Sequence, residues 1–147
     1  MPQRYHQVGA LCFRRKGKRH FDILLVTSRD TGRWIIPKGW PEKGKSLHRS
    51  AAREALEEAG VVGEVASKPL GQYPYKKIEL GGSKLLDVTV YPLLVKKLKE
   101  HWLEERERKR KWFDPRVAAG KVDEPELAAL LKALAKRISR GEEPLKL

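Results

Sequence analysis

The sequence predicts an α/β protein in which helices pack on a mixed β-sheet. Two observations support this fold class. Segments rich in β-branched and aromatic residues recur between residues 7 and 95, with turn signals between them. Residues 46–60 and 124–139 instead carry apolar side chains at the spacing of an amphipathic helix. The length of 147 residues indicates a single domain, residues 1–147.

The N-terminal part is predicted to begin with a β-hairpin. Its strands are "QVGALCFR" at 7–14 and "FDILLVTS" at 21–28, and "RKGKRH" supplies the turn. Cys12 lies in an apolar run and is expected to be a buried thiol. "RWIIP" follows as a short strand that Pro37 ends, and residues 37–45 form a loop because they hold two prolines and two glycines.

A helix is predicted between Ser46 and Gly60. Ser46 is a suitable N-cap residue, and Gly60 suits the left-handed position just after a helix. The helix presents one small, apolar face, which consists of Ala52, Ala55, Leu56 and Ala59. We expect that face to pack on the sheet, with three glutamates on the opposite face.

The C-terminal part is predicted to hold further strands and two helices. Strands are expected at 62–76 and 84–95, joined by the turn "ELGGS". Pro92 predicts a bulge or a sheet edge in the second of them. A short helix is expected in "DPRVAAGKV", and 124–139 is the predicted closing helix.

Composition narrows the class of protein. Lys and Arg number 32 against 19 Asp and Glu, and the net charge of +13 favours nucleic acid, polyphosphate or a membrane surface as partner, or else a solvated basic surface. A single cysteine excludes an internal disulfide and a cysteine zinc cluster. No segment has the ~20 apolar residues that span a bilayer. We therefore expect a soluble, cytoplasmic protein that does not associate with membranes.

Three glutamates, Glu54, Glu57 and Glu58, lie within one turn of the predicted helix. Like charges at this spacing repel, so basic neighbours or a bound cation should compensate. Carboxylate oxygens are ligands for hard divalent cations, and Mg²⁺ suits such a site when a phosphate completes the ligand set. One carboxylate could instead deprotonate a metal-bound water. The alternative is a solvated helix face that pairs with Arg49, Arg53 and nearby lysines.

The stretch 39–61 resembles the Nudix box, the signature of the Nudix hydrolases. Gly39 opens the pattern, and "REALEEAGV" from Arg53 to Val61 closes it at the right distance. The resemblance implies a Nudix-type α/β/α sandwich, with the mixed sheet between helices. One position departs from the pattern, because Lys45 stands where the box has a glutamate. Glu42 is near enough in sequence to substitute for that carboxylate.

The resemblance also implies roles for residues of the box. Glu54 and Glu58 match metal ligands, and Glu57 matches either a ligand or the general base. Arg53 matches the residue that orients the carboxylates. Lys38 or Gly39 would add a backbone carbonyl to the metal. The implied cofactor is Mg²⁺, with Mn²⁺ as an alternative.

Segments around the box resemble the diphosphoinositol polyphosphate phosphohydrolase branch, which also hydrolyses diadenosine polyphosphates. These segments are "ALCFR", "LLVTSRDTGRWIIP" and "KRKWF". In that branch basic residues hold the polyphosphate, and the matching positions are Ser28, Arg29, Arg33, Arg108, Lys109 and Arg110. If 105–113 is a strand, Arg106, Arg108 and Arg110 project from one face toward several phosphates. The alternative is a charged edge strand that resists aggregation.

Three functions are consistent with these patterns. The first is a Mg²⁺-dependent pyrophosphohydrolase for an anionic small molecule, either a diphosphoinositol polyphosphate or a dinucleoside polyphosphate. The second acts on another nucleoside diphosphate derivative or on RNA 5′ ends, which the basic charge would also suit. The third is a catalytically weak Nudix domain that binds nucleotide or nucleic acid. Trp40 could line the pocket, and a further carboxylate could come from Glu104, Glu105 or Glu107. The oligomeric state is open.

Overall fold

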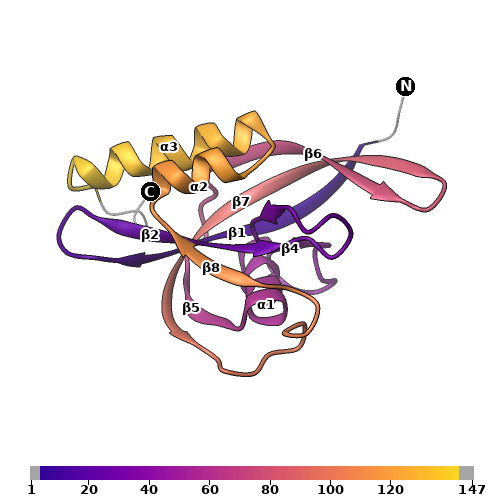
Figure 1. The fold of residues 1–147 in the computed structure, drawn as a ribbon, viewed down its shortest axis with the longest axis horizontal. Coiled ribbons are helices and arrows are strands. Elements are labelled where there is room, and N and C mark those ends of the chain that lie inside the picture. Colours follow the sequence, from indigo (N-terminus) through magenta and orange to yellow (C-terminus); the bar gives the residue numbers. More distant parts are fainter. Residues whose placement is uncertain (1–3, 143–147) are drawn as a thin grey trace.

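The computed structural model describes residues 4–142, which form one mixed β-sheet with helices on both faces (Figure 1). The elements in chain order are β1 (Tyr5–Arg15), β2 (Phe21–Thr27), β3 (Trp34–Ile35), β4 (Lys38–Gly39), α1 (Leu47–Ala59), β5 (Val61–Val65), β6 (Gly71–Glu79), β7 (Gly82–Leu98), β8 (Arg110–Phe113), α2 (Pro115–Lys121) and α3 (Pro125–Ser139). Within residues 4–142, no helix combines the length and the apolar character needed to cross a bilayer.

Strand β1 organises the sheet. It runs parallel to β7 from the pair Tyr5↔Leu86 to the pair Phe13↔Leu94, and antiparallel to β2 and β4. The main strand order is β3-β2-β1-β7-β5, while β4 pairs with β1, β6 with β7 and β8 with β2. The predicted hairpin and mixed sheet are therefore confirmed.

The helices cover the sheet from both sides, which confirms the predicted α/β/α sandwich. Helix α1 packs against β1 and β5, whereas α2 lies on β2 and α3 on β6 (Figure 1). The buried side chains of α3 form one stripe, at Leu127, Leu131, Leu134 and Ile138. Burial of each such side chain contributes about 1.5–3 kcal/mol, so the apolar spacing is what holds this helix on the sheet. Cys12 lies in the same core and is fully buried, as predicted.

Two predicted features of the strands are wrong. The segment 62–76 is not one strand, because β5 and β6 are separated by residues 66–70. Pro92 lies neither at a bulge nor at a sheet edge. It pairs with Leu11 of β1, and its carbonyl accepts from the Ala66 amide, at the point where the other partner of β7 changes from β6 to β5. A residue without an N–H is tolerated there because Pro92 belongs to neither the β5 nor the β6 ladder of β7.

The loop 37–45 contains a two-residue strand that places the box. Gly39 and Lys38 of β4 pair with Val8 and Gly9 of β1. The amide of Ala10 donates to the Pro37 carbonyl at 2.9 Å. These bonds hold Gly39 beside α1, where the glutamates begin.

Candidate functional site

Helix α1 sits close to the sheet because its inner face is small. Ala51, Ala55 and Ala59 are fully buried. The helix begins after Ser46, as predicted, but the Ser46 side chain makes no capping hydrogen bond. It ends at Gly60, whose φ of 67° is left-handed and whose amide donates to the Ala55 and Leu56 carbonyls.

The three glutamates do not share a solvent-facing side, which corrects the prediction that they all lie opposite the alanines. Glu58 is only 3% exposed, because it follows Ala51 and Ala55 on the inner face. Glu54 is half-buried, and the Glu57 side chain is 27% exposed. Leu56, assigned to the packed face, is instead exposed.

Gly39 makes room for Glu54. A Cβ at Gly39 would lie 2.3 Å from the Glu54 carboxyl carbon and 2.6 Å from its Oε2. Real Cβ atoms do not approach other atoms so closely, so a larger residue at position 39 would force the Glu54 carboxylate to move. The glycine that opens the box, Gly39, is thus explained by its contact with Glu54.

Burial is the main electrostatic feature of these carboxyl groups. Desolvation raises the pKa of Glu54 above its usual value, and the nearby Glu57 and Glu104 carboxylates act in the same direction. Burial also raises the pKa of Glu58 well above its usual range, opposed by the charge of Arg108. Within residues 4–142, Glu58 Oε1 has no hydrogen-bond partner. This site therefore favours a cation.

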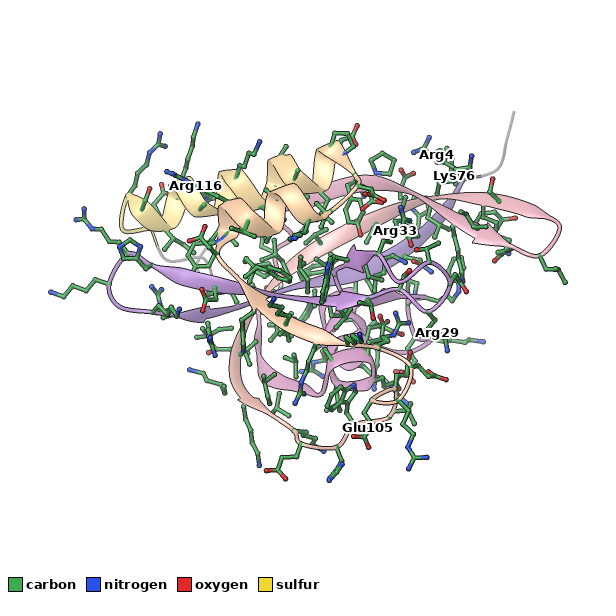
Figure 2. All side chains as sticks on the ribbon, viewed as in Figure 1. Arg4, Arg29, Arg33, Lys76, Glu105 and Arg116 are labelled. Atoms are coloured by element: carbon green, nitrogen blue, oxygen red, sulfur yellow. The ribbon has the colours of Figure 1, made fainter. Side chains whose placement is uncertain are left out.

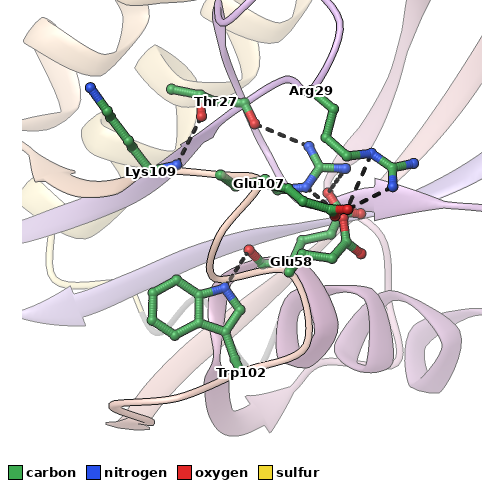
Figure 3. A network of polar contacts seen from close by, with 8 residues as sticks. Thr27, Arg29, Glu58, Trp102, Glu107 and Lys109 are labelled. Atoms are coloured by element: carbon green, nitrogen blue, oxygen red, sulfur yellow. Dashed lines mark hydrogen bonds and ion pairs between the residues drawn. The ribbon is translucent and has the colours of Figure 1, made fainter.

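Glu104 and Arg108 complete the inner part of the site. Arg108 Nε donates to Glu104 Oε1 at 2.8 Å, and Arg108 Nη2 lies 3.5 Å from Glu58 Oε1. Arg108 Nη1 also donates to the Thr27 carbonyl. Figure 3 shows this network with Arg29 and Glu107 at its outer side. The sequence suggests Glu104, Glu105 or Glu107 as a further carboxylate of the site. Of these three, Glu104 is the one whose negative charge raises the pKa of both Glu54 and Glu58.

A chain of ion pairs orients the outer glutamate. Arg53 Nε donates to Glu57 Oε1 at 2.9 Å, and Arg53 Nη1 donates to Glu42 Oε1 at 2.7 Å. Lys45 Nζ lies 2.9 Å from Glu42 Oε2. Lys45, where the box has a glutamate, thus pairs with Glu42 and closes the loop.

Basic side chains border the site on the side of β6. Lys38 Nζ lies 3.7 Å from the centre of the Tyr75 ring, and the Arg33 guanidinium lies 4.6 Å from it. Burial lowers the pKa of Lys38 to about 8, although Glu58 opposes this shift. Arg33 also pairs with Glu124 at 3.0 Å. Tyr75 could not be predicted from the sequence, because β6 brings its ring here from a position far along the chain.

A cleft of about 420 Å³ opens beside the box glutamates. Trp40, Arg53, Glu54 and Glu57 are among the residues that line it. The Trp40 ring is 44% exposed and meets Tyr5 edge-on. A flat ligand group could therefore contact Trp40 while its phosphates reach the glutamates.

The other predicted substrate residues occupy different positions. Ser28 is buried and shares a 2.7 Å hydrogen bond with the Thr31 hydroxyl, so it holds the loop after β2. The Arg29 side chain is 57% exposed beside Glu107. Lys109 is held through its backbone amide, which donates to Thr27 Oγ1, and its side chain points away from the network (Figure 3).

The condition that 105–113 is a strand is met only at Arg110–Phe113, which form β8. Residues 103–107 form turns, so Arg106, Arg108 and Arg110 do not lie on one face of a strand. Arg110 Nη1 donates to the Ala59 carbonyl at 2.8 Å, and its guanidinium lies 3.8 Å from the centre of the Trp102 ring. Arg108 and Arg110 thus contact protein groups, and their role toward substrate stays a prediction.

Comparison with known proteins identifies the family of this chain. The Nudix domain pattern matches residues 5–134, which include every site residue described above. The chain belongs to the Nudix family of hydrolases. The predicted box, derived from Gly39 and the Arg53–Val61 stretch, is thereby confirmed.

Relatives of this Nudix domain include plant and animal enzymes. Nudix hydrolase 21, chloroplastic, of Arabidopsis thaliana is 36% identical over 112 residues, which are 74% of this chain and 55% of the relative. Human diphosphoinositol polyphosphate phosphohydrolase 3-beta is 36% identical over 110 residues, 73% of this chain and 62% of the relative. The chain spans about half the length of the first curated relatives that it matches, at 55%, 53% and 42%.

Solved structures confirm the Nudix fold. The Ap4A hydrolase of C. elegans matches with a TM-score of 0.65 at 18% identity, covering 91% of this chain and 98% of that one. The dihydroneopterin triphosphate pyrophosphohydrolase of E. coli matches with a TM-score of 0.69 at 14% identity, covering 92% and 99%.

The residues of the site fit a hard divalent cation, the cofactor that the Nudix family implies. Among residues 4–142, no group of three or more His, Cys, Asp or Glu side chains is already arranged as a metal cluster. However, Glu54 and Glu58 are desolvated carboxyl groups in one place, and Glu58 Oε1 is buried without a hydrogen-bond partner. A cation would satisfy that oxygen and offset the repulsion between the carboxylates.

Proposed function

We propose that this Nudix domain hydrolyses a diphosphate linkage in a highly phosphorylated small molecule, with Mg²⁺ or Mn²⁺ as cofactor. A diphosphoinositol polyphosphate or a dinucleoside polyphosphate is the expected substrate. The observation that carries the proposal is the pair of desolvated carboxyl groups of α1, the half-buried Glu54 against Gly39 and the buried Glu58, with cationic side chains around them. A buried anionic centre with a basic border suits a metal that bridges to phosphate oxygens.

Glu54, Glu58 and a backbone carbonyl at Gly39 or Lys38 would hold the metal. When bound, the metal polarises the phosphoryl group and neutralises the charge that develops during water attack. Glu57 lies at the cleft wall, and Arg53 fixes its carboxylate by a direct hydrogen bond. We assign to Glu57 the role of accepting the proton of the attacking water, and its position and its hydrogen bond with Arg53 support that assignment.

The cations around the site would bind the remaining phosphates. Arg29 is exposed, and Arg33 and Lys38 flank Tyr75. Ser28, Arg108, Lys109 and Arg110 are the further positions for which we propose a part in substrate binding, through the loops that they hold or directly. The relative named diphosphoinositol polyphosphate phosphohydrolase and the fold neighbour named Ap4A hydrolase support this class of substrate.

The substrate is tested by product formation, resolved by anion-exchange chromatography, from a panel with and without Mg²⁺. The panel contains a diphosphoinositol polyphosphate, diadenosine tetraphosphate, ADP-ribose and a 5′-triphosphorylated RNA. We expect metal-dependent hydrolysis, fastest for the first two compounds because they present several phosphates to the cations. Faster hydrolysis of the RNA or of ADP-ribose would contradict this choice of substrate.

The catalytic roles predict the effect of two substitutions. Glu57→Gln and Glu58→Gln should each lower kcat by at least ~100-fold, the scale of losing general-base or metal-assisted catalysis. Glutamine keeps an acceptor for Arg53 or Arg108, so thermal melting should show folded variants. The control is Glu64→Gln, an exposed glutamate of β5. Turnover near the wild-type value in both site variants would refute the assignment.

A further inference from the structure

One hollow of the molecule lies outside the Nudix site. It has a volume of about 740 Å³ and is bordered by the turn between β1 and β2, the start of α2 and the second half of α3. Its cationic lining comes from Arg19, Arg116, Lys132 and Lys136, with His20 beside them. Asp114 is the one carboxylate among the lining residues. We call this feature the basic groove.

The basic groove is remote from the box glutamates. Gly39 pairs with Val8 near the start of β1, whereas the groove begins beyond Arg15, at the other end of that strand. Seven residues of β-strand separate these points by about 20 Å. Helices α2 and α3 also cover the sheet face opposite α1 (Figure 1). Figure 2 shows Arg116 on the helix pair, away from Arg29 and Arg33.

The cations of the basic groove are not neutralised by the protein. In the part of the chain that the structure describes, the side chains of Arg19, Arg116, Lys132 and Lys136 make no ion pair. Neighbouring basic residues do, since Arg14 and Lys16 both pair with Asp22. Asp114 is already engaged, because its Oδ1 accepts from the Arg116 amide as the cap of α2.

The positions of the two lysines add to the repulsion. Lys132 and Lys136 are four residues apart on α3, so they lie on the same helix face. Like charges at this spacing weaken a helix, and an anion between them would remove that cost. Lys136 in the last turn also interacts favourably with the helix dipole, but Lys132 lies too far from the end for this benefit.

The basic groove combines its charges with an apolar floor. Phe21, Pro115 and Ala135 line it together with the cations, and because Phe21 is only 5% exposed this floor offers a small apolar contact rather than an open ring face. A purely phosphorylated ligand would use the cations and leave the floor unused, whereas a nucleic acid strand brings both phosphates and flat bases. We propose that the basic groove binds single-stranded nucleic acid, RNA or DNA, independently of hydrolysis at the Nudix site.

The experiment measures binding of fluorescent ten-nucleotide oligo(U) and oligo(dT) to the full chain by anisotropy across a range of salt. The test variant is Lys132→Ala/Lys136→Ala, which keeps good helix formers on α3. The matched control is Lys96→Ala/Lys97→Ala, two exposed lysines of β7 that remove the same charge. Tighter binding of oligo(U) than of oligo(dT) would identify RNA as the natural ligand, and the reverse would identify DNA.

A plot of the logarithm of the association constant against the logarithm of the salt concentration has a negative slope. Loss of two phosphate contacts should make that slope less steep by about 1.4, at ~0.7 per contact. At physiological salt this corresponds to an affinity about 10-fold weaker. The control should bind as the wild type does. Inorganic polyphosphate of equal phosphate number should compete poorly, because it cannot use the floor.

Three results would overturn the proposal. They are wild-type binding by the groove variant, equal losses in both double variants, and competition by polyphosphate as strong as that by the oligonucleotide. Phosphate release by the groove variant is measured in parallel and should equal that of the wild type. Because binding and hydrolysis are read separately, failure of the proposed activity leaves this test intact.

Discussion

At the scale of single residues, close contact decides which side chains can serve the site. Gly39 and Glu54 are in contact because β4 crosses directly over α1. Glu58 is buried because it occupies the alanine face rather than the opposite one. A carboxylate in such a position is stabilised only by Arg108 or by a cation, so the residue is costly to the fold and suited to metal binding.

Gly39→Ala should reduce catalysis much more than stability. The new Cβ would displace the Glu54 carboxylate, and a shift of about 1 Å in a catalytic group can cost about 100-fold in rate. The measurements are kcat with Mg²⁺ and the melting temperature. Gly120→Ala is the matched control, since its Cβ would meet no atom within 4 Å and it lies in α2. That control should keep full activity and gain about 0.5–1 kcal/mol. Full activity in Gly39→Ala would contradict the role given to the contact.

At the scale of elements, the segment between β7 and β8 and the first residue of β8 hold the C-terminal end of α1. Trp102 Nε1 donates to the Glu58 carbonyl at 3.0 Å, and Arg110 donates to the Ala59 carbonyl. The Glu104 amide donates to the Glu57 carbonyl at 3.1 Å. The last carbonyls of a helix have no partner within it, so these contacts keep the box glutamates in place.

Arg110→Ala should therefore act mainly on stability. Losing a charged hydrogen bond to a carbonyl costs about 1.5–3 kcal/mol. For a chain of this size a loss of about 2 kcal/mol lowers Tm by roughly 4–8 °C. Arg106→Ala serves as control, because that exposed side chain should change stability by less than about 0.5 kcal/mol. Melting curves and the KM for a polyphosphate distinguish a role in stability from a role in substrate binding. An unchanged Tm with a raised KM would show that Arg110 binds substrate instead.

The elements also show what the sequence could predict. Strands, helices and the box followed from local spacing, which is why β1, β2, α1 and α3 were placed correctly. The charged run before β8 was misplaced because alternating signs fit a strand and a helical turn equally well. Its Glu104 carbonyl accepts from both the Glu107 and Arg108 amides, a turn that the Glu104–Arg108 ion pair supports. The burial of Glu58 and the approach of Glu104 depend on contacts distant in sequence.

At the scale of the whole molecule, the net charge of +13 includes two separate groups of basic side chains. One is the border of the Nudix site, where Arg33 and Lys38 flank Tyr75. The other is the basic groove on the opposite sheet face. We propose an anionic ligand for each surface, but only the first lies beside the box carboxylates.

Metal binding should stabilise the entire domain, because it removes repulsion that only the folded chain has. At 100 times its Kd, a ligand specific to the folded state adds about 2.7 kcal/mol. For this chain length Mg²⁺ should raise Tm by about 5 °C or more relative to the same protein in EDTA. The double variant Glu54→Gln/Glu58→Gln should show little or no such shift, since it lacks the ligands. Differential scanning calorimetry provides the measurement, and Glu64→Gln should respond as the wild type does. An equal Mg²⁺ shift in the double variant would place the cation elsewhere in the molecule.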